Sequence, residues 1–460
     1  NRGRSVPPLP ARGGREGTLS VGLTLIQRGT TRPPPRNPKI ALVLSGGAVA
    51  GGAFKVGGLK ALNDALVGRG VHELDIYVGL SAGAFLATPL AWGIPPDEMI
   101  RVLEGTSEDF SQLRGIDFYW PNIGEFLRRP AVFSLRLASY LPGLLIDLVS
   151  ALPELPSTVG PSLRRFMARP SYTRLERLLM RLLEEISPKR EIPSPAMLLP
   201  SGLFDNRPLE RWLRENMEAN GIPNNFSEFH KESGRRLYIT AMNLDTAERV
   251  VFGPENDHSL RISEAVQASS ALPGFFRPAR LGGVDYVDGG VRRTANIDVA
   301  IEQGADLVIC YNPFRPFLNI VGSPQSRGYL AEEGFLQVFN QVFRTLLHSR
   351  LALGLQAYLR DDRFHGDIVV IEGRESDEQF FGVNPLAFWK REESVRHGFE
   401  SVRRTLEDHA EVLAPVLARY GLELRTPGVA PEPAAPRETE EPLEESGSVT
   451  RLRAGAARPA

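Results

Sequence analysis

Two kinds of apolar run alternate near the start of the folded part of the chain. Residues 39–45 form a continuous apolar run that opens into glycines, as is typical of a strand buried on both faces. Residues 54–67 then show helical spacing, residues 74–80 form a second strand-like run, and residues 82–92 are helix-like. A strand–helix–strand–helix order of this length predicts right-handed crossovers and a parallel sheet.

Later elements continue the alternation, so the predicted fold class is α/β. Further strands are expected at residues 236–241, 250–252, 306–311 and 367–371. Further helices are expected at residues 207–217, 329–359 and 394–419. Residues 112–203 interrupt the pattern with a Leu-, Pro- and Arg-rich segment that has an amphipathic piece near residues 163–186. We interpret this segment as a helical insertion near the active site, a lid or a pocket wall. Ordinary helical packing on the sheet edge explains it equally well.

Composition divides the chain into a folded body and two arms. Residues 1–38 are rich in Pro, Gly and Arg, and we expect them to form a disordered basic arm. Residues 425–460 are rich in Pro, Ala and Glu, and we expect a disordered tail there. The body between them is long enough for one large α/β domain or two smaller ones.

Net charge and cysteine content exclude several classes of protein. The formal net charge is -1, so nothing in the composition indicates binding to nucleic acid. The single cysteine, Cys310, rules out an internal disulfide and a cysteine-based metal cluster. Because it lies in an apolar run, we predict a buried structural thiol.

A membrane-spanning helix is not expected. Residues 1–36 do not resemble a secretory signal, and the sequence has no stretch of about 18 uninterrupted apolar residues. Residues 131–153 come nearest, but Arg136, Pro142 and Asp147 interrupt them, which suits a segment that lies on a membrane. We therefore predict a cytoplasmic protein with the option of peripheral attachment to a membrane surface.

The pattern Gly79-Leu-Ser-Ala-Gly83 stands where the second strand passes into the second helix. In that context it predicts a nucleophile elbow, a strained turn that presents a serine hydroxyl. The flanking glycines allow the backbone to pass close to its neighbours. Ser81 would then lie at a helix N-terminus, where the helix dipole favours developing negative charge.

A second glycine-rich segment, Ser45-Gly-Gly-Ala-Val-Ala-Gly-Gly52, ends the first strand and opens the first helix. Backbone N–H groups exposed there form an anion site, for a phosphate or for the oxyanion of acyl transfer. No Gly-Lys-Ser/Thr follows, and Ala48 or Val49 occupies the middle position of a Gly-x-Gly-x-x-Gly pattern, so nucleotide binding fits poorly. With a serine elbow downstream, an oxyanion hole formed by Gly46, Gly47 and Ala48 is the better interpretation.

A third segment, Val284-Asp-Tyr-Val-Asp-Gly-Gly-Val291, places Asp288 between a short apolar run and the pair Gly289 and Gly290. Asp-Gly is also a common hairpin turn, and the segment alone favours that interpretation. A catalytic role for Asp288 is supported by the serine elbow, because a serine nucleophile needs a base and Asp288 could take the Ser81 proton directly.

A histidine would be a better base near neutral pH, since its unperturbed pKa is about 6.5 against about 3.9 for aspartate. The chain order Ser81, Asp288, then His348 or His365 would suit a Ser-Asp-His triad of the α/β-hydrolase type. However, His348 falls inside an expected helix and His365 in a charged loop, so we interpret both as structural or solvated. A triad esterase stays open as an alternative.

Together and in this order, the three motifs resemble the patatin-like phospholipase family. Residues 203–209, 237–246 and 269–278 are also similar to segments of that family. The resemblance implies a three-layer patatin-like fold with a central, mostly parallel sheet. It also implies a catalytic domain at residues 39–313, which contains the helical insertion, and a C-terminal helical extension at residues 314–424 packed on that domain.

The resemblance further implies a serine acyl hydrolase that acts on phospholipids, lysophospholipids or neutral lipids. Ser81 and Asp288 would form its catalytic dyad, with the glycine loop as oxyanion hole and no metal or other cofactor. The expected partner is a lipid ester substrate met at a membrane surface, and no oligomeric state is predicted.

One feature of the glycine loop departs from the family pattern. That loop usually reads Gly-Gly-Gly, a small residue, Arg or Lys, and Gly. Here Ala48 or Val49 replaces the third glycine, one residue is inserted, and the basic residue is missing. A catalytically silent lipid-binding relative therefore stays open as a second alternative.

Overall fold

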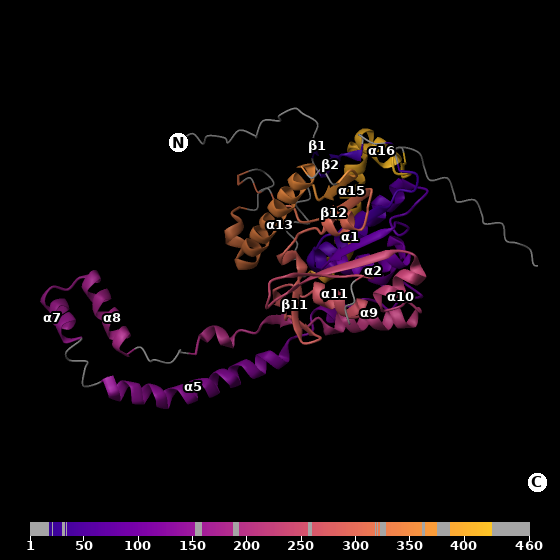
Figure 1. Ribbon diagram of the computed structural model, residues 1–460. Helices are drawn as coiled ribbons and strands as arrows, with labels where there is room; N and C mark the ends of the chain where they lie inside the picture. Colours follow the sequence, from indigo (N-terminus) through magenta and orange to yellow (C-terminus); the bar gives the residue numbers. More distant parts are fainter. Residues whose placement is uncertain are drawn as a thin grey trace, which may run out of the picture. The chain divides into compact units, whose positions relative to one another are not determined.

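The computed structural model describes residues 18–425, except residues 21, 30–32, 34, 152–158, 187–192, 256–259, 318, 320, 323–327, 361–363 and 375–386. The predicted tail thus lies outside the described residues, apart from Arg425. The described residues all belong to one unit of the chain (Figure 1).

Ten of the described strands form the main sheet, in the order β1-β2-β13-β12-β3-β5-β7-β11-β10, with β8 paired to β7. Their bounds are β1 Thr18–Ser20, β2 Leu23–Gln27, β3 Ile40–Leu44, β5 Ile76–Leu80, β7 Arg236–Asn243, β8 Arg249–Phe252, β10 Ala279–Leu281, β11 Val284–Asp288, β12 Leu307–Asn312 and β13 Asp367–Glu372. Two small sheets pair β4 (Leu66–Val67) with β14 (Glu423–Leu424), and β6 (Gly202–Phe204) with β9 (Gly274–Phe276).

The five central strands, β13, β12, β3, β5 and β7, run parallel to one another. Antiparallel strands extend the sheet on both sides, β2 and β1 beyond β13, and β11 and β10 beyond β7. In a parallel sheet the carboxyl ends of the strands meet at one edge, so the loops after β3 and β5 are neighbours. The prediction of an α/β fold around a central, mostly parallel sheet is confirmed.

Helices lie between many of the described strands. Their bounds are α1 Ala48–Ala65, α2 Ala82–Trp92, α3 Pro96–Glu104, α4 Gly115–Phe118, α5 Ile123–Ala151, α7 Gly160–Ala168, α8 Tyr172–Ile186, α9 Arg207–Ala219, α10 Phe226–Ser233, α11 Ile262–Ser269, α12 Ile297–Glu302, α13 Phe335–Arg360, α15 Arg391–Asp408 and α16 Ala410–Ala418. Short 3₁₀ turns lie at Pro195–Leu198, Gly289–Val291, Leu330–Glu333 and Phe388–Lys390.

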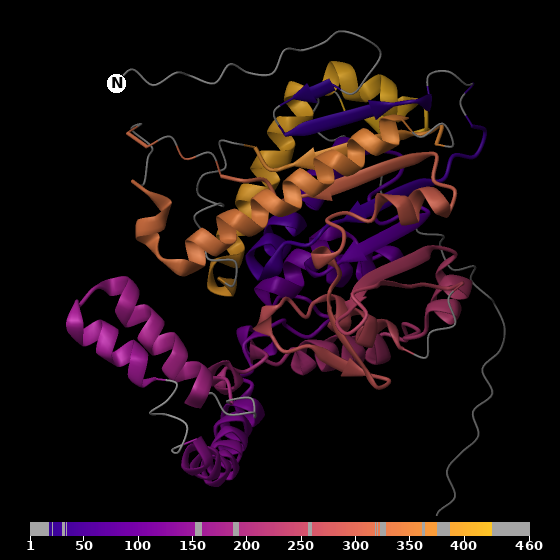
Figure 2. The ribbon, with the colours of Figure 1, turned by 60° about the vertical axis from the view of Figure 1, so that its left-hand side comes forward.

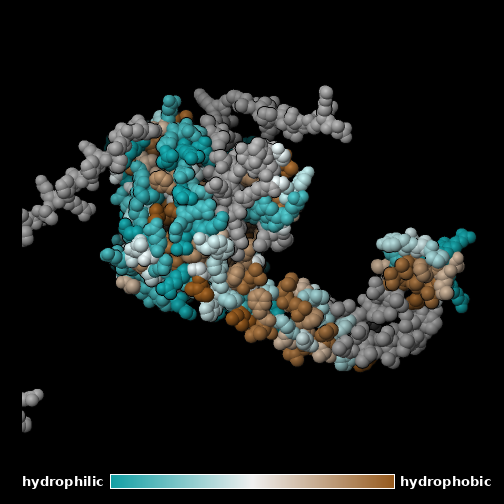
Figure 3. Space-filling model, turned by 180° about the vertical axis from the view of Figure 1, so that it is seen from behind, coloured by the Kyte–Doolittle hydropathy of each residue, from teal (hydrophilic) through white to brown (hydrophobic). Residues whose placement is uncertain are grey.

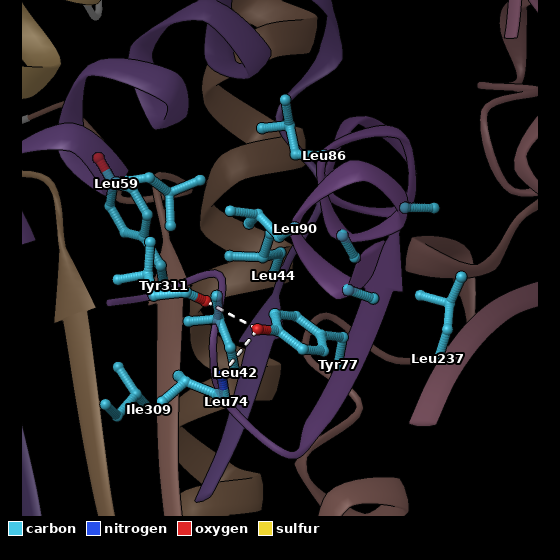
Figure 4. Packing of buried hydrophobic residues seen from close by; sticks show 14 of the residues in the cluster. Leu42, Leu44, Leu59, Leu74, Tyr77, Leu86, Leu90, Leu237, Ile309 and Tyr311 are labelled. Carbon is cyan, nitrogen blue, oxygen red and sulfur yellow. Dashed lines mark hydrogen bonds between the residues drawn. The ribbon is translucent and has the colours of Figure 1, made fainter. Parts of the chain in front are cut away.

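Side chains of each central strand alternate between two hydrophobic cores, one on each face of the sheet. In β3, Leu42 packs with residues of α1, α2 and α15, whereas Val43 packs with residues of α12 and α13. Figure 4 shows part of the first core, where Leu42 and Leu44 of β3 lie together with Leu59 and Tyr311 from two other elements. Figure 2 shows α13 lying along the opposite face. The sheet is therefore the middle of three layers, as the resemblance implies.

The N-terminal arm corrects a prediction. Strands β1 and β2 lie within residues 1–38, which the composition assigns to a disordered arm, yet β2 pairs antiparallel with β13. Leu23, Leu25 and Ile26 are buried there. The short apolar run covers the edge of β13, and this local gain outweighs the Pro- and Arg-rich composition around it.

Residues 314–424 contribute to the sheet as well as to the helical layers. They supply β13, and α15 packs so closely on α1 that a Cβ on Gly57 would overlap with Val395, and one on Gly398 with Phe54. The expected helix at 394–419 is divided at His409 into α15 and α16. Residues 112–203 hold α4, α5, α7 and α8. The domain boundaries themselves stay a prediction.

Candidate active site

Ser81 occupies the junction between β5 and α2, as the nucleophile-elbow pattern predicts. It is buried, and its backbone φ is 54° with ψ at −127°, a conformation that non-glycine residues rarely adopt. The turn places Ser81 at the N-cap of the eleven-residue helix α2. Such strain persists only where the surrounding structure holds it.

The two flanking glycines are required by close backbone packing. A Cβ on Gly79 would overlap with the backbone of Ala84, and one on Gly83 would overlap with the carbonyl oxygens of Leu44 and Ser45. A larger residue at Gly79 would therefore push the start of α2 away from β5, and one at Gly83 would push it away from the end of β3. This contact brings Ser81 next to the glycine loop.

Ser269, the last residue of α11, fixes the elbow from behind. The backbone N–H of Ser81 donates to the Ser269 hydroxyl at 2.7 Å, and that hydroxyl donates to the carbonyl oxygen of Thr240 at 2.7 Å. Residues 269–278 contribute to the resemblance in the sequence, but the role of this hydroxyl emerges only from the structure.

Asp288 ends β11, one strand beyond the neighbour of β5. Thr240 of β7 pairs with Leu80, the residue before Ser81, and the next residue of β7, Ala241, pairs with Asp288. The two predicted catalytic residues therefore lie at the same level of the sheet, on either side of β7. The Asp288 carboxylate is buried and accepts a hydrogen bond from the backbone N–H of Gly290 at 2.8 Å. Gly289 lies against the carbonyl oxygen of Thr240.

The environment of Asp288 changes its acidity. Burial raises the pKa of the Asp288 carboxyl to about 6, while hydrogen bonds from the Ser81 side chain and the Gly290 N–H, together with the charge of Lys55, act in the opposite direction. A carboxylate with a pKa near 6 is a better proton acceptor near neutral pH than an ordinary aspartate. Ser81 thus lies close enough to Asp288 to influence the acidity of its carboxyl.

The glycine loop ends β3 and opens α1, whose N-cap is Gly47. A Cβ on Gly46 would come within 3.4 Å of the Ser81 Cβ, so the loop lies directly beside the elbow. Ala48 has a φ of 51°, in the left-handed region that favours glycine. Within the described part of the chain, the N–H groups of Gly46, Gly47 and Ala48 precede the first helical hydrogen bond, which the Gly51 N–H donates to Gly47. They are therefore suitable donors to an oxyanion.

The predicted site residues line a common cavity. Gly46, Ala48, Ser81, Asp288 and Gly290 all border a space of about 630 Å³ whose other walls are mainly apolar. Phenylalanines 275, 314, 339 and 343 are among the residues that form these walls. The cavity thus joins a hydroxyl, a carboxylate and backbone donors to an apolar environment.

Neither histidine of the alternative triad contacts this group in the structure. His365 precedes β13, at the amino edge of the parallel strands, whereas Ser81 follows the carboxyl end of β5. His348 lies on α13, with its Nδ1 at 3.3 Å from the Glu372 carboxylate. Glu372 ends β13, and two strands separate β13 from β5.

Two further residues bear on the chemistry. Cys310 is fully buried in β12, as predicted, and burial raises the pKa of its thiol. Lys55, which the sequence analysis did not single out, is buried beneath the glycine loop. A lysine within the apolar run of α1 was the available signal. Among the described residues, no group of three or more His, Cys, Asp or Glu side chains lies together as a metal site would.

Comparisons with known proteins bear on the family of the chain. A family model described as patatin-like phospholipase matches residues 42–301, more than half of the chain. The chain is 27% identical over 103 residues to a probable lipid hydrolase, 463L, of Invertebrate iridescent virus 6, covering 22% of this chain and 36% of that protein. It is 33% identical over 79 residues to the uncharacterized protein YjjU of Escherichia coli (strain K12), covering 17% and 21%. The matches thus span about a third and a fifth of these curated relatives.

Solved structures with some likeness include VipD from Legionella pneumophila, at a TM-score of 0.35 and 15% identity over 87% of this chain and 72% of that one. Human GIVD cytosolic phospholipase A2, in complex with methyl gamma-linolenyl fluorophosphonate, gives a TM-score of 0.33 and 13% identity, covering 84% and 59%.

Proposed function

The chain belongs to the patatin-like phospholipase family, and we propose that it hydrolyses carboxylic esters of lipids, with Ser81 as nucleophile and Asp288 as general base. The observation that carries the proposal is that these two residues border the same cavity. A serine in a strained turn at a helix N-terminus borders this cavity together with a buried carboxyl whose pKa is raised to about 6.

In the proposed reaction, the Ser81 hydroxyl attacks the acyl carbonyl while its proton moves to Asp288. Gly46, Gly47 and Ala48 donate their N–H groups to the tetrahedral oxyanion. The C–O bond of the ester then breaks, Asp288 returns the proton to the leaving alcohol, and an acyl-Ser81 ester remains. Water attacks this ester, gives its proton to Asp288, and releases the fatty acid as Ser81 regains its hydrogen.

A lipid acyl chain fits the second cavity at Ser81. This cavity of about 660 Å³ is lined by Ser81, Ala82 and otherwise mainly apolar side chains from several elements. It shares lining residues with a third, apolar cavity of about 670 Å³. The shared residues are Val56, Phe85, Leu86, Leu103 and Leu113. Two adjoining apolar spaces that begin at the nucleophile favour a long acyl chain over a short polar one.

We also propose that α5 contacts the membrane that holds the substrate. Leu127, Leu135 and Ile146 are 71%, 70% and 64% exposed, and helical spacing places them on one side of α5. Arg128 and Arg136 are exposed nearby. Figure 3 shows apolar surface along this helix. Exposed apolar side chains beside arginines suit an anionic bilayer surface.

Within the described residues, none of the helices combines the length and apolar character needed to cross a membrane. The cytoplasmic location stays a prediction.

A silent lipid-binding protein is the second candidate, and Ala48 is the observation that favours it. Its φ of 51° places a Cβ where the family usually has glycine. Alanine in this conformation costs about 1–2 kcal/mol, which would weaken an oxyanion hole that depends on this backbone. The two candidates differ in whether Ser81 reacts.

Labelling with a fluorophosphonate probe tests the proposal, because the probe reacts covalently only with an activated serine. We expect wild-type protein to be labelled and to hydrolyse a p-nitrophenyl ester, and Ser81→Ala to do neither while keeping its melting temperature. Ser227→Ala, which removes an exposed hydroxyl on α10, is the matched control and should be labelled normally. An unlabelled wild type would favour the silent protein, and a labelled Ser81→Ala would remove Ser81 as nucleophile.

A further inference from the structure

Lys55 is an ionisable side chain in the core of the protein. It lies on α1, its exposed fraction is 0%, and its neighbours in the sequence, Phe54 and Val56, are buried apolar residues. A buried ammonium group is costly unless its protons are hydrogen-bonded. The Lys55 Nζ donates to the carbonyl oxygen of Ser45 and, at 3.2 Å, to that of Gly46. Both acceptors belong to the glycine loop.

These two hydrogen bonds constrain the direction of the loop's N–H groups. In a trans peptide, the C=O of one residue and the N–H of the next point in opposite directions. Because Lys55 draws the carbonyls of Ser45 and Gly46 to the core side, the N–H groups of Gly46 and Gly47 point away from Lys55. Gly46 itself borders the cavity that contains Ser81 and Asp288.

Electrostatics couples Lys55 to the same site. Burial lowers the pKa of the Lys55 ammonium to about 7, whereas the charges of Asp288 and Cys310 act to raise it. Lys55 in turn lowers the pKa of the Asp288 carboxyl. The titratable groups that act on Lys55 are thus Asp288 at the end of β11 and Cys310 in β12, and Cys310 is itself affected by Glu372 of β13.

We propose that Lys55 is a positioning residue of the hydrolase: from beneath the glycine loop it holds the Ser45 and Gly46 carbonyls inward and so directs the Gly46 and Gly47 N–H groups at the oxyanion. The inference rests on the proposed function of Ser81 and Asp288. The glycine loop lacks the basic residue that the family pattern usually has. Lys55 brings a basic side chain to this loop from the helix that follows it.

The test compares Lys55→Met with Lys55→Gln and with a matched control, Lys60→Met. Methionine has a similar length but no donor, and glutamine keeps N–H donors without the charge. Lys60 lies on the same helix, is partly exposed, and is paired with Asp64 and Asp97. Fluorophosphonate titration gives the concentration of reactive Ser81, so kcat for a p-nitrophenyl ester is expressed per active site.

We expect Lys55→Met to lose about 10²-fold in kcat per active site with KM changed less than about threefold, as when an oxyanion donor is removed. Lys55→Gln should regain about tenfold of this loss, because it restores a donor to the loop. Without the lysine charge, the acid limb of kcat/KM should move to higher pH. Lys60→Met should match the wild type in all three measurements.

A purely structural lysine would give a different result. Lys55→Met would then lower the melting temperature or the labelled fraction, yet kcat per active site and the acid limb would stay within about twofold of the wild type, which would overturn the inference. If Lys55→Met does not fold, Lys55→Gln decides by the same criteria. A wild type without turnover would instead overturn the proposed function and this inference with it.

Discussion

The backbone N–H of Ser81 donates a 2.7 Å hydrogen bond to the hydroxyl of Ser269. Ser269 is the last residue of α11, and its hydroxyl donates a hydrogen bond to the carbonyl oxygen of Thr240 in β7. Ser269 therefore joins the elbow to both a helix and a central strand. Ser81 needs such support because its φ of 54° is unfavourable for a residue with a side chain. The strained turn is thus held by a neighbour remote in sequence.

Removing this support should reduce activity more than stability alone explains. In Ser269→Ala the Ser81 N–H loses its acceptor, the elbow shifts, and we expect kcat to fall about tenfold or more with KM nearly unchanged. Ser263→Ala, which removes another buried hydroxyl of α11, is the control and should retain normal kcat. Equal kcat values in the two variants would show that Ser269 does not position Ser81.

The assignment of the base predicts the effect of three further substitutions. Asp288→Asn should lose about 10³-fold or more in kcat, because an amide takes no proton from Ser81. His348→Ala and His365→Ala should stay within about tenfold of the wild type, since neither contacts Ser81. Steady-state kinetics on one soluble ester checks all three. A histidine variant as inactive as Asp288→Asn would restore the triad alternative.

The raised pKa of Asp288 predicts opposite pH trends for activity and for stability. As a base it must be ionised, so kcat/KM should rise with pH through about 6. The native state, however, favours the protonated form relative to the unfolded chain, whose carboxyl has its ordinary pKa of 3.8. The stability that Asp288 contributes is therefore full below about pH 4 and is lost as pH rises through about 6.

It follows that Asp288→Asn should be more stable than the wild type at pH 8, by about 1–3 kcal/mol, and should lose this advantage near pH 4. Thermal unfolding at the two pH values measures the difference. An Asp288→Asn variant that is less stable at pH 8 would mean that the ionised carboxylate stabilises the fold.

Much of this architecture could be predicted from local patterns. The runs at residues 39–45 and 74–80 are buried strands because both of their faces meet a hydrophobic core, and such strands are recognisable from continuous apolar sequence. The turn at Ser81 is equally local, since Gly79 and Gly83 show where the backbone is crowded. That Asp288 lies opposite Ala241 in β7 required the sheet order, which spacing alone does not give.

Other features depend on contacts between distant segments. Residues 23–27 form β2 because the edge of β13, more than three hundred residues later in the chain, is there to pair with. Lys55 is equally hidden from local reasoning. In sequence it is one polar residue on an apolar helix, and its role depends on carbonyls that the preceding loop turns toward it.

The apolar cavities predict a preference for long acyl chains. They also predict which of the cavities beside Ser81 holds the acyl chain. Each methylene buried is worth about 0.8 kcal/mol, so kcat/KM for p-nitrophenyl esters should rise up to about fourfold per added carbon until the space is filled. Leu113→Phe narrows the two adjoining cavities and should shift the preference to shorter chains. Leu347→Phe narrows the cavity on the Asp288 side instead. A shift in Leu347→Phe alone would place the acyl chain on that side.

The exposed apolar side of α5 predicts where the protein meets its substrate. Hydrolysis should be faster on vesicles that contain phosphatidylglycerol than on a dispersed short-chain ester, because the bilayer takes up apolar side chains and attracts nearby arginines. Replacing Leu127, Leu135 and Ile146 with glutamine keeps the helix propensity of α5 but removes its exposed apolar side chains. We expect vesicle binding to weaken about tenfold or more, with turnover of the dispersed ester within about twofold.

A second variant controls for the loss of exposed apolar surface in general. Leu346 and Leu353 are exposed on α13, and their replacement by glutamine removes similar side chains from another helix. This double variant should bind vesicles as the wild type does if α5 is the contact. Co-sedimentation with vesicles, measured beside turnover of both substrates, separates the cases. Equal loss of turnover on both substrates in the α5 variant would mean that its side chains support the fold or the acyl pocket, because a docking surface affects only the substrate held in a membrane.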